Sequence, residues 1–446
     1  MTTDLRAAVD RVLPGVRRDL EALVRIPSVS ADPARADDVR RSAQAVADLA
    51  RDAGAAESRI LSVEGGAPAV VASWPAPEGM PTVLLYAHHD VQPTGDPDAW
   101  SSDPFEPTER DGRLYGRGTA DDKAGVLAHL AAVRAYEGRP PVGVRLFVEG
   151  EEEVGSPTFV PFLESHRDLL AADVIVVADS ANWAVGVPAL TTSLRGFALV
   201  QVEVRTLDHH LHSGMYGGPV PDATTALVRL LATLHDGRGD VAVAGLVARR
   251  ASEVDYPEGD FRADAGVLDG VELIGSGSIA DRLWTRPALT VIGMDVPSVD
   301  GAAGVLQPVA RATVSARLAP GQDPDAAVEA LTAHLTSHAP FGAHVTVTPA
   351  TAGPATALDT SGPVYDAARA ALREAWGGVA PVEMGVGGSI PFIAEIARLF
   401  PGSSVLVTGV EDPDSRAHGA DESLHLGEFA RVCLAEALLL RHLTSG

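Results

Sequence analysis

The sequence has a single cysteine, Cys433, and a single lysine, Lys123, among its 446 residues. One cysteine can form no disulfide within the chain, and it excludes a metal site built from several thiolates. Any metal ligands must therefore be histidine, aspartate or glutamate. Arginine carries nearly all of the positive charge, a usage that we attribute to nucleotide composition and from which we infer no function.

Long apolar runs and a positive net charge are also lacking. No apolar stretch is long enough to span a bilayer. Residues 1–24 spread charges through an amphipathic helical pattern, without the apolar core of a signal peptide. The formal net charge of -25 repels polyanions at long range. We therefore expect a cytoplasmic protein that binds neither nucleic acid nor a membrane.

Apolar periodicity predicts a layered α/β domain. About the first 180 residues of the chain alternate expected helices with short, fully apolar strands. The helices are residues 4–24, 39–53 and 122–137, and the strands are residues 83–86, 144–148 and 174–178. Fully apolar strands between helices are typical of a sheet that is covered on both faces. At 446 residues, the chain is also long enough for more than one domain.

The pattern changes near residue 195. Residues 198–205 and 310–318 alternate apolar and polar side chains, as strands with one solvated face do. Expected helices near 223–235 and 324–338 would cover the other face, and this predicts a small α+β domain. Helix and strand alternation then resumes with residues 363–376, 405–408 and 427–442. We therefore predict a first domain in two parts, 1–192 and 351–446, with an inserted domain of residues 193–350.

A histidine cluster follows the first apolar strand. In an extended chain, residues two apart share a face, so His88 and Asp90 would point the same way while His89 points away. A metal-binding imidazole and a carboxylate that orients it need this arrangement. Two surface histidines in a turn are the alternative interpretation.

Carboxylates and one further histidine stand at other element ends. Asp121 and Asp122 open an expected helix, residues 149–153 form an acidic run after a strand, and Asp179 follows another strand. His418 lies in a polar loop. A helix N-cap or a solvated acidic loop would explain each one alone. Together they supply enough oxygen and imidazole ligands for a two-metal centre.

Five motifs occur in the order HHDVQP, GRGTADDKAG, EGEEEVGS, LHSGMYGG and GGSIP. In this order they resemble the di-zinc metallopeptidase family of carnosinase, bacterial cytosolic dipeptidases, glutamate carboxypeptidase, aminoacylase and succinyl-diaminopimelate desuccinylase, and most of all its dipeptidase branch. The resemblance implies a zinc-exopeptidase-like α/β catalytic domain, a mixed sheet covered by helices, with an inserted α+β lid. It also implies a homodimer formed through the lid.

The resemblance implies a ligand set for two divalent ions. Asp121 would bridge the ions, with His88 and Asp179 completing one site, and Glu153 and His418 the other. The ions would be zinc, with cobalt or manganese as alternatives. The resemblance also makes the peptide bond between Asp121 and Asp122 a candidate for the cis geometry.

The resemblance further implies roles around the ions. Glu152 would be the general base, and Asp90 would orient His88. His212 would stabilise the oxyanion, often from the partner subunit, although an exposed polar turn is the alternative for it and for its neighbours His209 and His210.

Substrate contacts can be carried over in the same way. Arg317 would clamp the substrate carboxylate, where a surface arginine is the alternative. Gly388 and Ser389 would line the loop around the substrate's C-terminal end. Gly385 and Val386 stand where close relatives of carnosinase often have Arg-Glu, so the resemblance assigns no residue to the substrate's amino end.

The sequence thus predicts metal-dependent hydrolysis of the amide bond of dipeptides or short peptides with a free carboxylate. An N-acyl-amino-acid deacylase or desuccinylase would share the metals and the base, and would differ only in the pocket lining. A non-catalytic metal-binding peptide receptor is disfavoured because Glu152 is present. A one-metal or metal-free relative is disfavoured because every expected ligand is present.

Overall fold

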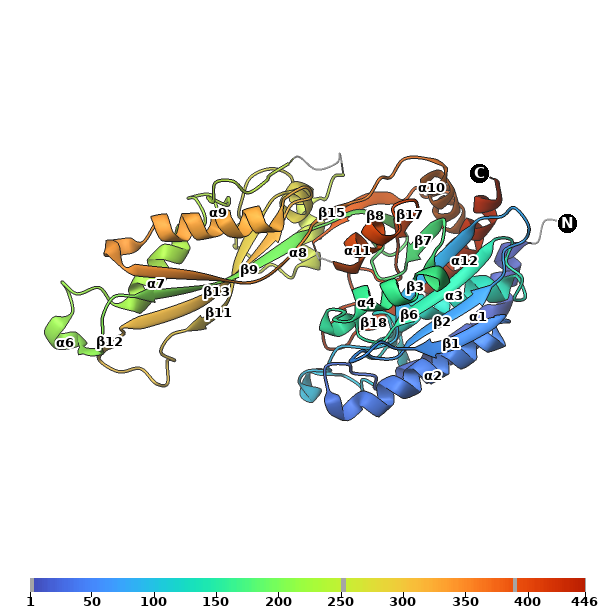
Figure 1. Cartoon of the computed structure of the whole chain (residues 1–446), viewed down its shortest axis with the longest axis horizontal. Coiled ribbons are helices and arrows are strands. Elements are labelled where there is room, and N and C mark those ends of the chain that lie inside the picture. The colour runs from blue at the N-terminus through green and yellow to red at the C-terminus, as the bar shows by residue number, and fades with distance from the viewer. Residues whose placement is uncertain (1–3, 250–253, 388–390, 446) are drawn as a thin grey trace. The chain divides into compact units, whose positions relative to one another are not determined.

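The computed structural model of the chain describes residues 4–249, 254–387 and 391–445 (Figure 1). The chain forms two compact units. Unit 1 consists of Met1–Thr192, Leu358–Met384 and Glu395–Gly446, and unit 2 consists of Ser193–Ala357 and Gly385–Ala394. Within the described ranges, no helix is both long and apolar enough to cross a membrane.

A large mixed sheet forms the centre of unit 1. Its middle strands are parallel neighbours in the order β6 (Gly143–Glu149), β3 (Thr82–His88), β7 (Val174–Val177) and β17 (Ser404–Val407). Antiparallel strands flank them on both sides. Beyond β6 lie β2 (Ala69–Trp74) and then β1 (Glu57–Leu61). Beyond β17 lies β8 (Ala189–Leu194), which also pairs with β16 (Val382–Val386). The carboxyl ends of the parallel strands therefore meet at one edge of the sheet.

Helices cover both faces of this sheet. Successive side chains of a strand point to opposite sides, so its apolar strands supply buried side chains to both faces. Val83 and Leu85 of β3 join a core built with α1 (Leu5–Val24), α2 (Ala36–Asp52), α3 (Lys123–Ala135), α10 (Pro363–Ala375) and α12 (Leu426–His442). On the other face Tyr86 and Phe147 contact Phe159 of α4 (Phe159–Ser165), with ring centroids 6.3 and 6.0 Å away. The predicted α/β fold class is confirmed, and the predicted helices and strands of this unit occur within a few residues of their expected bounds.

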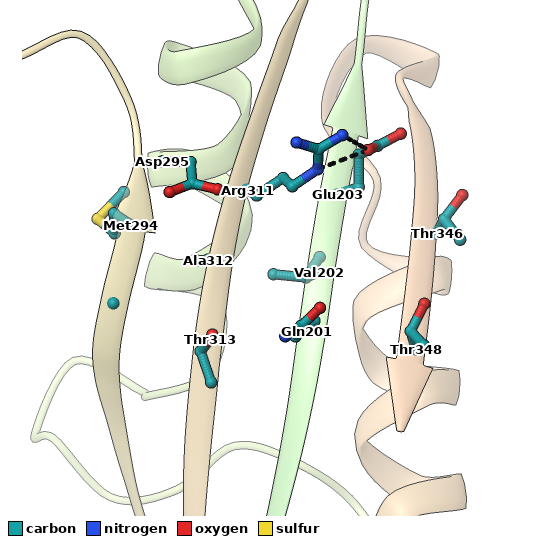
Figure 2. A pocket seen from close by; sticks show the side chains of 11 residues that line it. Gln201, Val202, Glu203, Met294, Asp295, Arg311, Ala312, Thr313, Thr346 and Thr348 are labelled. Atoms are coloured by element: carbon teal, nitrogen blue, oxygen red, sulfur yellow. Dashed lines mark hydrogen bonds and ion pairs between the residues drawn. The ribbon is translucent and has the colours of Figure 1, made fainter. Parts of the chain in front are cut away.

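Unit 2 is a four-stranded antiparallel sheet with helices on one face. The strand order is β11 (Ala288–Asp295), β13 (Val309–Leu318), β9 (Gly196–Arg205) and β14 (His344–Gly353). α7 (Ala223–Ala232) and α9 (Pro324–Ser337) cover the face that carries Val200 and Val202. The opposite face is polar, and Arg311 and Glu203 form an ion pair of 2.7 Å in a shallow hollow of about 270 Å³ (Figure 2). The alternation in the sequence reflects these two environments.

Shorter elements connect these layers. The remaining strands are β4 (Thr108–Arg110), β5 (Arg113–Tyr115), β10 (Leu211–His212), β12 (Val305–Leu306), β15 (Thr356–Ala357) and β18 (Ser423–His425). The remaining helices are α5 (Arg167–Leu170), α6 (Ser213–Tyr216), α8 (Glu258–Asp264) and α11 (Pro391–Leu399). Short helical turns are η1 (Pro33–Arg35), η2 (Pro97–Ala99), η3 (Glu152–Val154), η4 (Asp281–Thr285), η5 (Pro340–Gly342) and η6 (Leu443–Ser445).

Candidate metal centre

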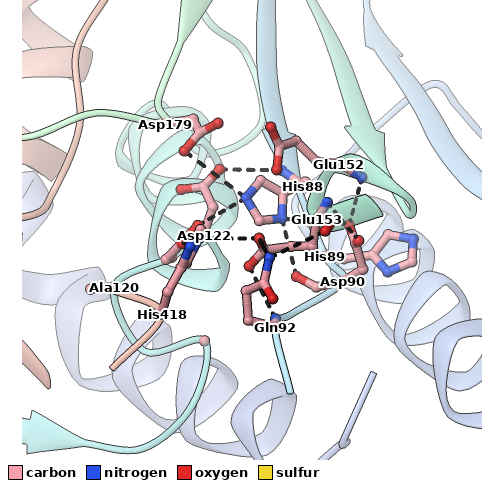
Figure 3. A network of polar contacts seen from close by, with 12 residues as sticks. His88, His89, Asp90, Gln92, Ala120, Asp122, Glu152, Glu153, Asp179 and His418 are labelled. Carbon is pink, nitrogen blue, oxygen red and sulfur yellow. Dashed lines mark hydrogen bonds and ion pairs between the residues drawn. The ribbon is translucent and has the colours of Figure 1, made fainter. Parts of the chain in front are cut away.

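Five side chains that the sequence singled out as ligands lie together at the carboxyl edge of the parallel strands (Figure 3). His88 is the last residue of β3, and Asp179 follows β7 by two positions. Glu153 lies in η3, just after β6, and Asp121 lies two positions before the start of α3. His418 comes from the loop between β17 and β18. Ligands of α/β sheets collect at this edge because the strands all end there.

Asp121 lies between two histidines. Its Oδ1 is 3.0 Å from Nε2 of His88, and its Oδ2 is 2.9 Å from Nε2 of His418. Nε2 of His418 is also 3.2 Å from Oε2 of Glu153, while Nε2 of His88 is 4.0 Å from Oδ1 of Asp179. Each oxygen of one carboxylate thus faces a different imidazole, which is the arrangement that a bridging ligand requires. The peptide bond after Asp121 is cis, as the resemblance implied.

Asp90 connects the imidazole of His88 to the acidic turn. Nδ1 of His88 is 3.0 Å from the backbone oxygen of Asp90 and 3.5 Å from its Oδ1. A proton on Nδ1 leaves Nε2 as the atom that can bind a metal. The Asp90 carboxylate also accepts hydrogen bonds from the backbone N–H groups of Glu152 and Glu153, at 3.2 and 3.1 Å. Asp90 is completely buried, so it holds both the histidine and the turn in fixed positions.

Gln92 is a residue of the site to which the sequence analysis gave no role. Its backbone N–H donates to Oε1 of Glu153 at 3.0 Å, and its side-chain Nε2 donates to Oε2 at 2.8 Å. Both oxygens of Glu153 are therefore held from one side. The available signal was spacing, since Gln92 follows Asp90 by two positions in an extended segment.

A buried salt bridge joins the two loops that carry Asp121 and His418. Glu422 has no exposed surface, and it accepts hydrogen bonds from Nη1 of Arg117 at 2.7 Å and from three backbone N–H groups. These donors are Gly118 at 3.0 Å, Ala120 at 2.9 Å and Asp121 at 3.1 Å. Arg117 also donates to the backbone oxygen of Gly419 at 3.0 Å. No local sequence pattern indicates this pair.

The centre has an excess of buried negative charge. Burial, together with the charge of Asp179, raises the pKa of Glu152 to about 9. Burial also raises the pKa of Asp179 to about 7, and the neighbouring Asp121 adds to this shift against the opposing charge of His88. Hydrogen bonds to Asp121 and Glu153 raise the pKa of His418 to about 11. The raised pKa values of the two carboxylates and of the histidine all reflect a surplus of negative charge, which a bound cation would offset.

The donor set fits divalent cations. Two groups of side chains, His88 with Asp121 and Glu153, and His88 with Glu152 and Asp179, have ligand atoms within 4.8 Å of one another. Ligands on one zinc ion, at about 2.0–2.2 Å from the metal, lie about 3 to 4 Å from each other. The separations of 2.9 to 4.0 Å around Asp121 and His88 match that spacing. Imidazole nitrogens with carboxylate oxygens are also a set that zinc, cobalt and manganese accept.

Two expected substrate contacts belong to unit 2. His212 is exposed at the end of β10, and its Nδ1 accepts a hydrogen bond from the N–H of Gly214 at 3.1 Å. Arg317 lies on β13 and points away from the core helices, since its neighbours Ala316 and Leu318 are buried. Gly388 and Ser389 lie outside the described residues.

Arg195 is a buried cation of unit 2. Its guanidinium donates to the backbone oxygens of Leu283 and Arg286 at 2.6 and 2.8 Å. Burial and the nearby charge of Arg317 lower the pKa of Arg195 to about 10. Two guanidinium groups close enough to repel each other are stabilised by an anion.

Comparisons with known proteins agree with this chemistry. Residues 84–442, which contain all five expected ligands, match the model of peptidase family M20/M25/M40. A cysteinylglycine-S-conjugate dipeptidase of Corynebacterium striatum is 38% identical over 81% of this chain and 80% of its own length. A β-Ala-His dipeptidase of Rattus norvegicus is 30% identical, over 82% of this chain and 78% of its own.

Solved structures share the whole fold. Human carnosine dipeptidase 1 superposes with a TM-score of 0.82 at 25% identity, covering 99% of this chain and 98% of its own. The dipeptidase Dug1p of Saccharomyces cerevisiae gives a TM-score of 0.83 at 23% identity, with coverage of 100% and 98%, which supports the fold alone. The chain therefore belongs to peptidase family M20/M25/M40 and is a metallopeptidase.

Proposed function

We propose that this protein is a dipeptidase that hydrolyses the amide bond of small peptides with a free carboxylate at a centre of two divalent ions. The observation that carries the proposal is the position of the Asp121 carboxylate, with one oxygen facing His88 and the other facing His418. Similarity to dipeptidases over about four fifths of the chain supports the substrate class.

We assign one ion to His88, Asp121 and Asp179, and the other to Asp121, Glu153 and His418. Zinc is the first choice because it suits this mixture of imidazole and carboxylate, and cobalt or manganese are the alternatives. Bound at these positions, the ions would polarise the scissile carbonyl and acidify the attacking water.

Glu152 takes a proton from the attacking water and returns it to the leaving amine in this proposal. Two features support it: Glu152 lies beside Asp179 and His88 in one group of convergent ligand atoms, and Asp90 fixes its backbone. A glutamate that is not engaged as a ligand can move a proton in both directions during one turnover. Asp90 acts through His88 and η3, as a positioning residue.

His212 and Arg317 complete the proposed substrate contacts. Because Nδ1 of His212 accepts from Gly214, the proton of the neutral ring belongs on Nε2, and this N–H is a donor suited to a developing oxyanion. By contrast, His209 is engaged by the neighbouring Asp208. Arg317 lies close enough to Arg195 to lower the pKa of Arg195, and in this proposal Arg317 would bind the substrate carboxylate. Gly388 and Ser389 keep their proposed place beside that carboxylate.

We also propose that a second copy of the chain pairs with the edge of unit 2. β11 is one of the two edge strands of its sheet and carries exposed apolar side chains, among them Ile292, which is 58% exposed. Exposed apolar edge strands are templates for pairing with another chain. Light scattering should give the mass of a dimer, and Ile292→Lys should shift it toward a monomer. A monomeric wild-type protein at micromolar concentration would contradict this proposal.

A substrate panel tests the proposed function. Metal-free protein would receive zinc, cobalt or manganese and then be offered unblocked dipeptides, N-acetyl amino acids and N-succinyl-diaminopimelate. Cleavage of the dipeptides alone, dependent on added metal, is the expected result. Preference for acylated amino acids would move the assignment to a deacylase or desuccinylase, while activity that persists without metal would contradict the proposed centre.

A further inference from the structure

A short segment after β17 is held against the chain that follows Asp179. The N–H of Asn182 donates to the backbone oxygen of Glu411 at 2.8 Å, and the N–H of Glu411 donates to that of Ser180 at 3.4 Å. Gly409 permits this approach, since a Cβ on it would lie 1.5 Å from the backbone oxygen of Ser180. The backbone of Glu411 is therefore fixed beside the loop that presents Asp179, in unit 1.

Glu411 also lies in the loop that carries His418, and its charge is coupled to charged groups of the metal centre. Burial raises the pKa of Glu411 well above its usual value, and the negative charges of Asp121, Asp179 and Glu422 add to this effect while His418 opposes it. Glu411 keeps partial exposure to solvent. Its side chain makes no hydrogen bond and no ion pair with any residue that the structure describes.

Several acidic side chains around the centre have close partners, whereas those of Glu152 and Glu411 have none among the described residues. Glu153 is held by Gln92, Glu422 by Arg117, and Asp90 by His88 and the turn after β6. Glu411 is distinguished from the proposed base Glu152 by its place: its backbone lies beside the loop of Asp179, its charge is coupled to those of Asp121 and Asp179, and it keeps partial exposure to solvent. A partly buried carboxylate without an internal cation is suited to receive a cation from a ligand.

We propose that Glu411 binds the free ammonium group of the substrate. This inference rests on the proposed function, and it narrows the substrate class to peptides with an unblocked amino end. Such a group is needed at this place, because in a dipeptide of α-amino acids the amino group is bonded to the carbon next to the scissile carbonyl. It would therefore lie close to the divalent ions, which repel it.

The same contact would separate dipeptides from the acylated alternatives. An N-acyl amino acid has no ammonium group, and it would leave the Glu411 carboxylate unpaired on binding. Sites that pair a polar group of the substrate discriminate strongly against analogues that lack it, since the partner in the site loses its compensation.

The test compares Glu411→Gln with the wild type on two matched ligands. Ala-Gly carries the ammonium group, and propionyl-glycine is the same molecule with hydrogen in its place. The measurements are kcat/KM for Ala-Gly, the inhibition constant of propionyl-glycine, and the zinc content of the purified enzyme. Glu411→Asp tests whether a shorter carboxylate restores activity on Ala-Gly. Glu164→Gln, which changes an exposed glutamate of α4, is the matched control.

With the loss of one charge-assisted contact, kcat/KM for Ala-Gly should fall roughly 10- to 100-fold in Glu411→Gln. The inhibition constant of propionyl-glycine and the zinc content should stay at the wild-type values, and Glu411→Asp should recover part of the activity. Glu164→Gln should behave as the wild type.

Three results for Glu411→Gln would overturn the proposal. They are an unchanged kcat/KM for Ala-Gly, an equal weakening of the binding of propionyl-glycine, and a loss of zinc. Loss of zinc would mean that Glu411 helps to hold the ions. A wild-type enzyme that cleaves no unblocked dipeptide with any metal would instead contradict the proposed function. The two failures are therefore distinguishable.

Discussion

Replacing Glu422 by glutamine should weaken both the stability of unit 1 and its affinity for metal. The carboxylate of Glu422 is completely buried and satisfies Arg117 and three backbone N–H groups of the loop that ends at Asp121. An amide has the same shape but only one acceptor oxygen, and its NH₂ group would face donors. The change therefore removes charge without creating a cavity.

The size of the effect follows from these contacts. Hydrogen bonds to charged groups contribute about 1.5–3 kcal/mol each, and removing one partner of a buried ion pair costs about 3–5 kcal/mol. Arg117 is itself only 1% exposed, so its charge cannot turn to water. We expect the free energy of unfolding to fall by about 3–5 kcal/mol, which is a large share of the about 5–15 kcal/mol that stabilises a typical protein.

Urea unfolding of the metal-free protein measures the change in the free energy of unfolding. Competition with a chelating dye measures the zinc affinity of the folded protein. Glu428→Gln is a matched control, because Glu428 is also fully buried and accepts from Nε1 of Trp376 at 2.8 Å, but lies on α12. The control should lose stability and keep its zinc affinity. A Glu422→Gln variant whose free energy of unfolding falls by less than about 1 kcal/mol, or that binds zinc as tightly as the wild type, would contradict this prediction.

Four further predictions test the centre itself. Glu152→Gln should retain its metal content by elemental analysis while turnover falls about 10²- to 10⁴-fold, and full activity would remove Glu152 as the base. His418→Ala should weaken one of two zinc-binding steps in calorimetry, and two tightly held ions would show that the ligand assignment is wrong. His212→Ala should lower kcat by about 10²- to 10³-fold with an unchanged melting temperature, whereas unchanged kinetics would return His212 to an ordinary surface turn. Chelation should lower the melting temperature of the wild type and zinc should restore it, since a ligand that binds only the folded state stabilises it; an unchanged melting temperature would argue against a resident ion.

Local patterns in the sequence were sufficient for most elements of the fold. The predicted strand at 83–86 and helix at 122–137 correspond to β3 and α3, because apolar periodicity depends only on which side of an element is buried. The same holds for the alternating strand at 310–318, which is β13. Where strands end in histidine or carboxylate, the sequence also indicated a metal site, since parallel strands share one edge.

The sequence did not show which residues that are distant in the chain contact each other. Glu422 contacts the N–H of Gly118 across 304 positions, and Gln92 contacts Glu153 across 61. No local pattern distinguishes such a glutamate from a solvated one, because its environment is created only when the loops are packed together. Gln92 and Glu153 stand in the quoted motifs and Glu422 does not, but the roles of all three depend on distances that only the folded chain defines.

The sequence by itself determined the element order, the α/β class, the family resemblance and the types of residue that can hold divalent ions. Only the packed chain shows that the two oxygens of Asp121 face His88 and His418, and that Asp90 holds the turn of Glu152. It also places Glu411 beside the loop of Asp179, with no side-chain partner among the described residues. The physical reason is that burial and charge at a site are sums over residues that are distant in the chain. Periodicity is a property of neighbours, whereas electrostatics is a property of the packed molecule.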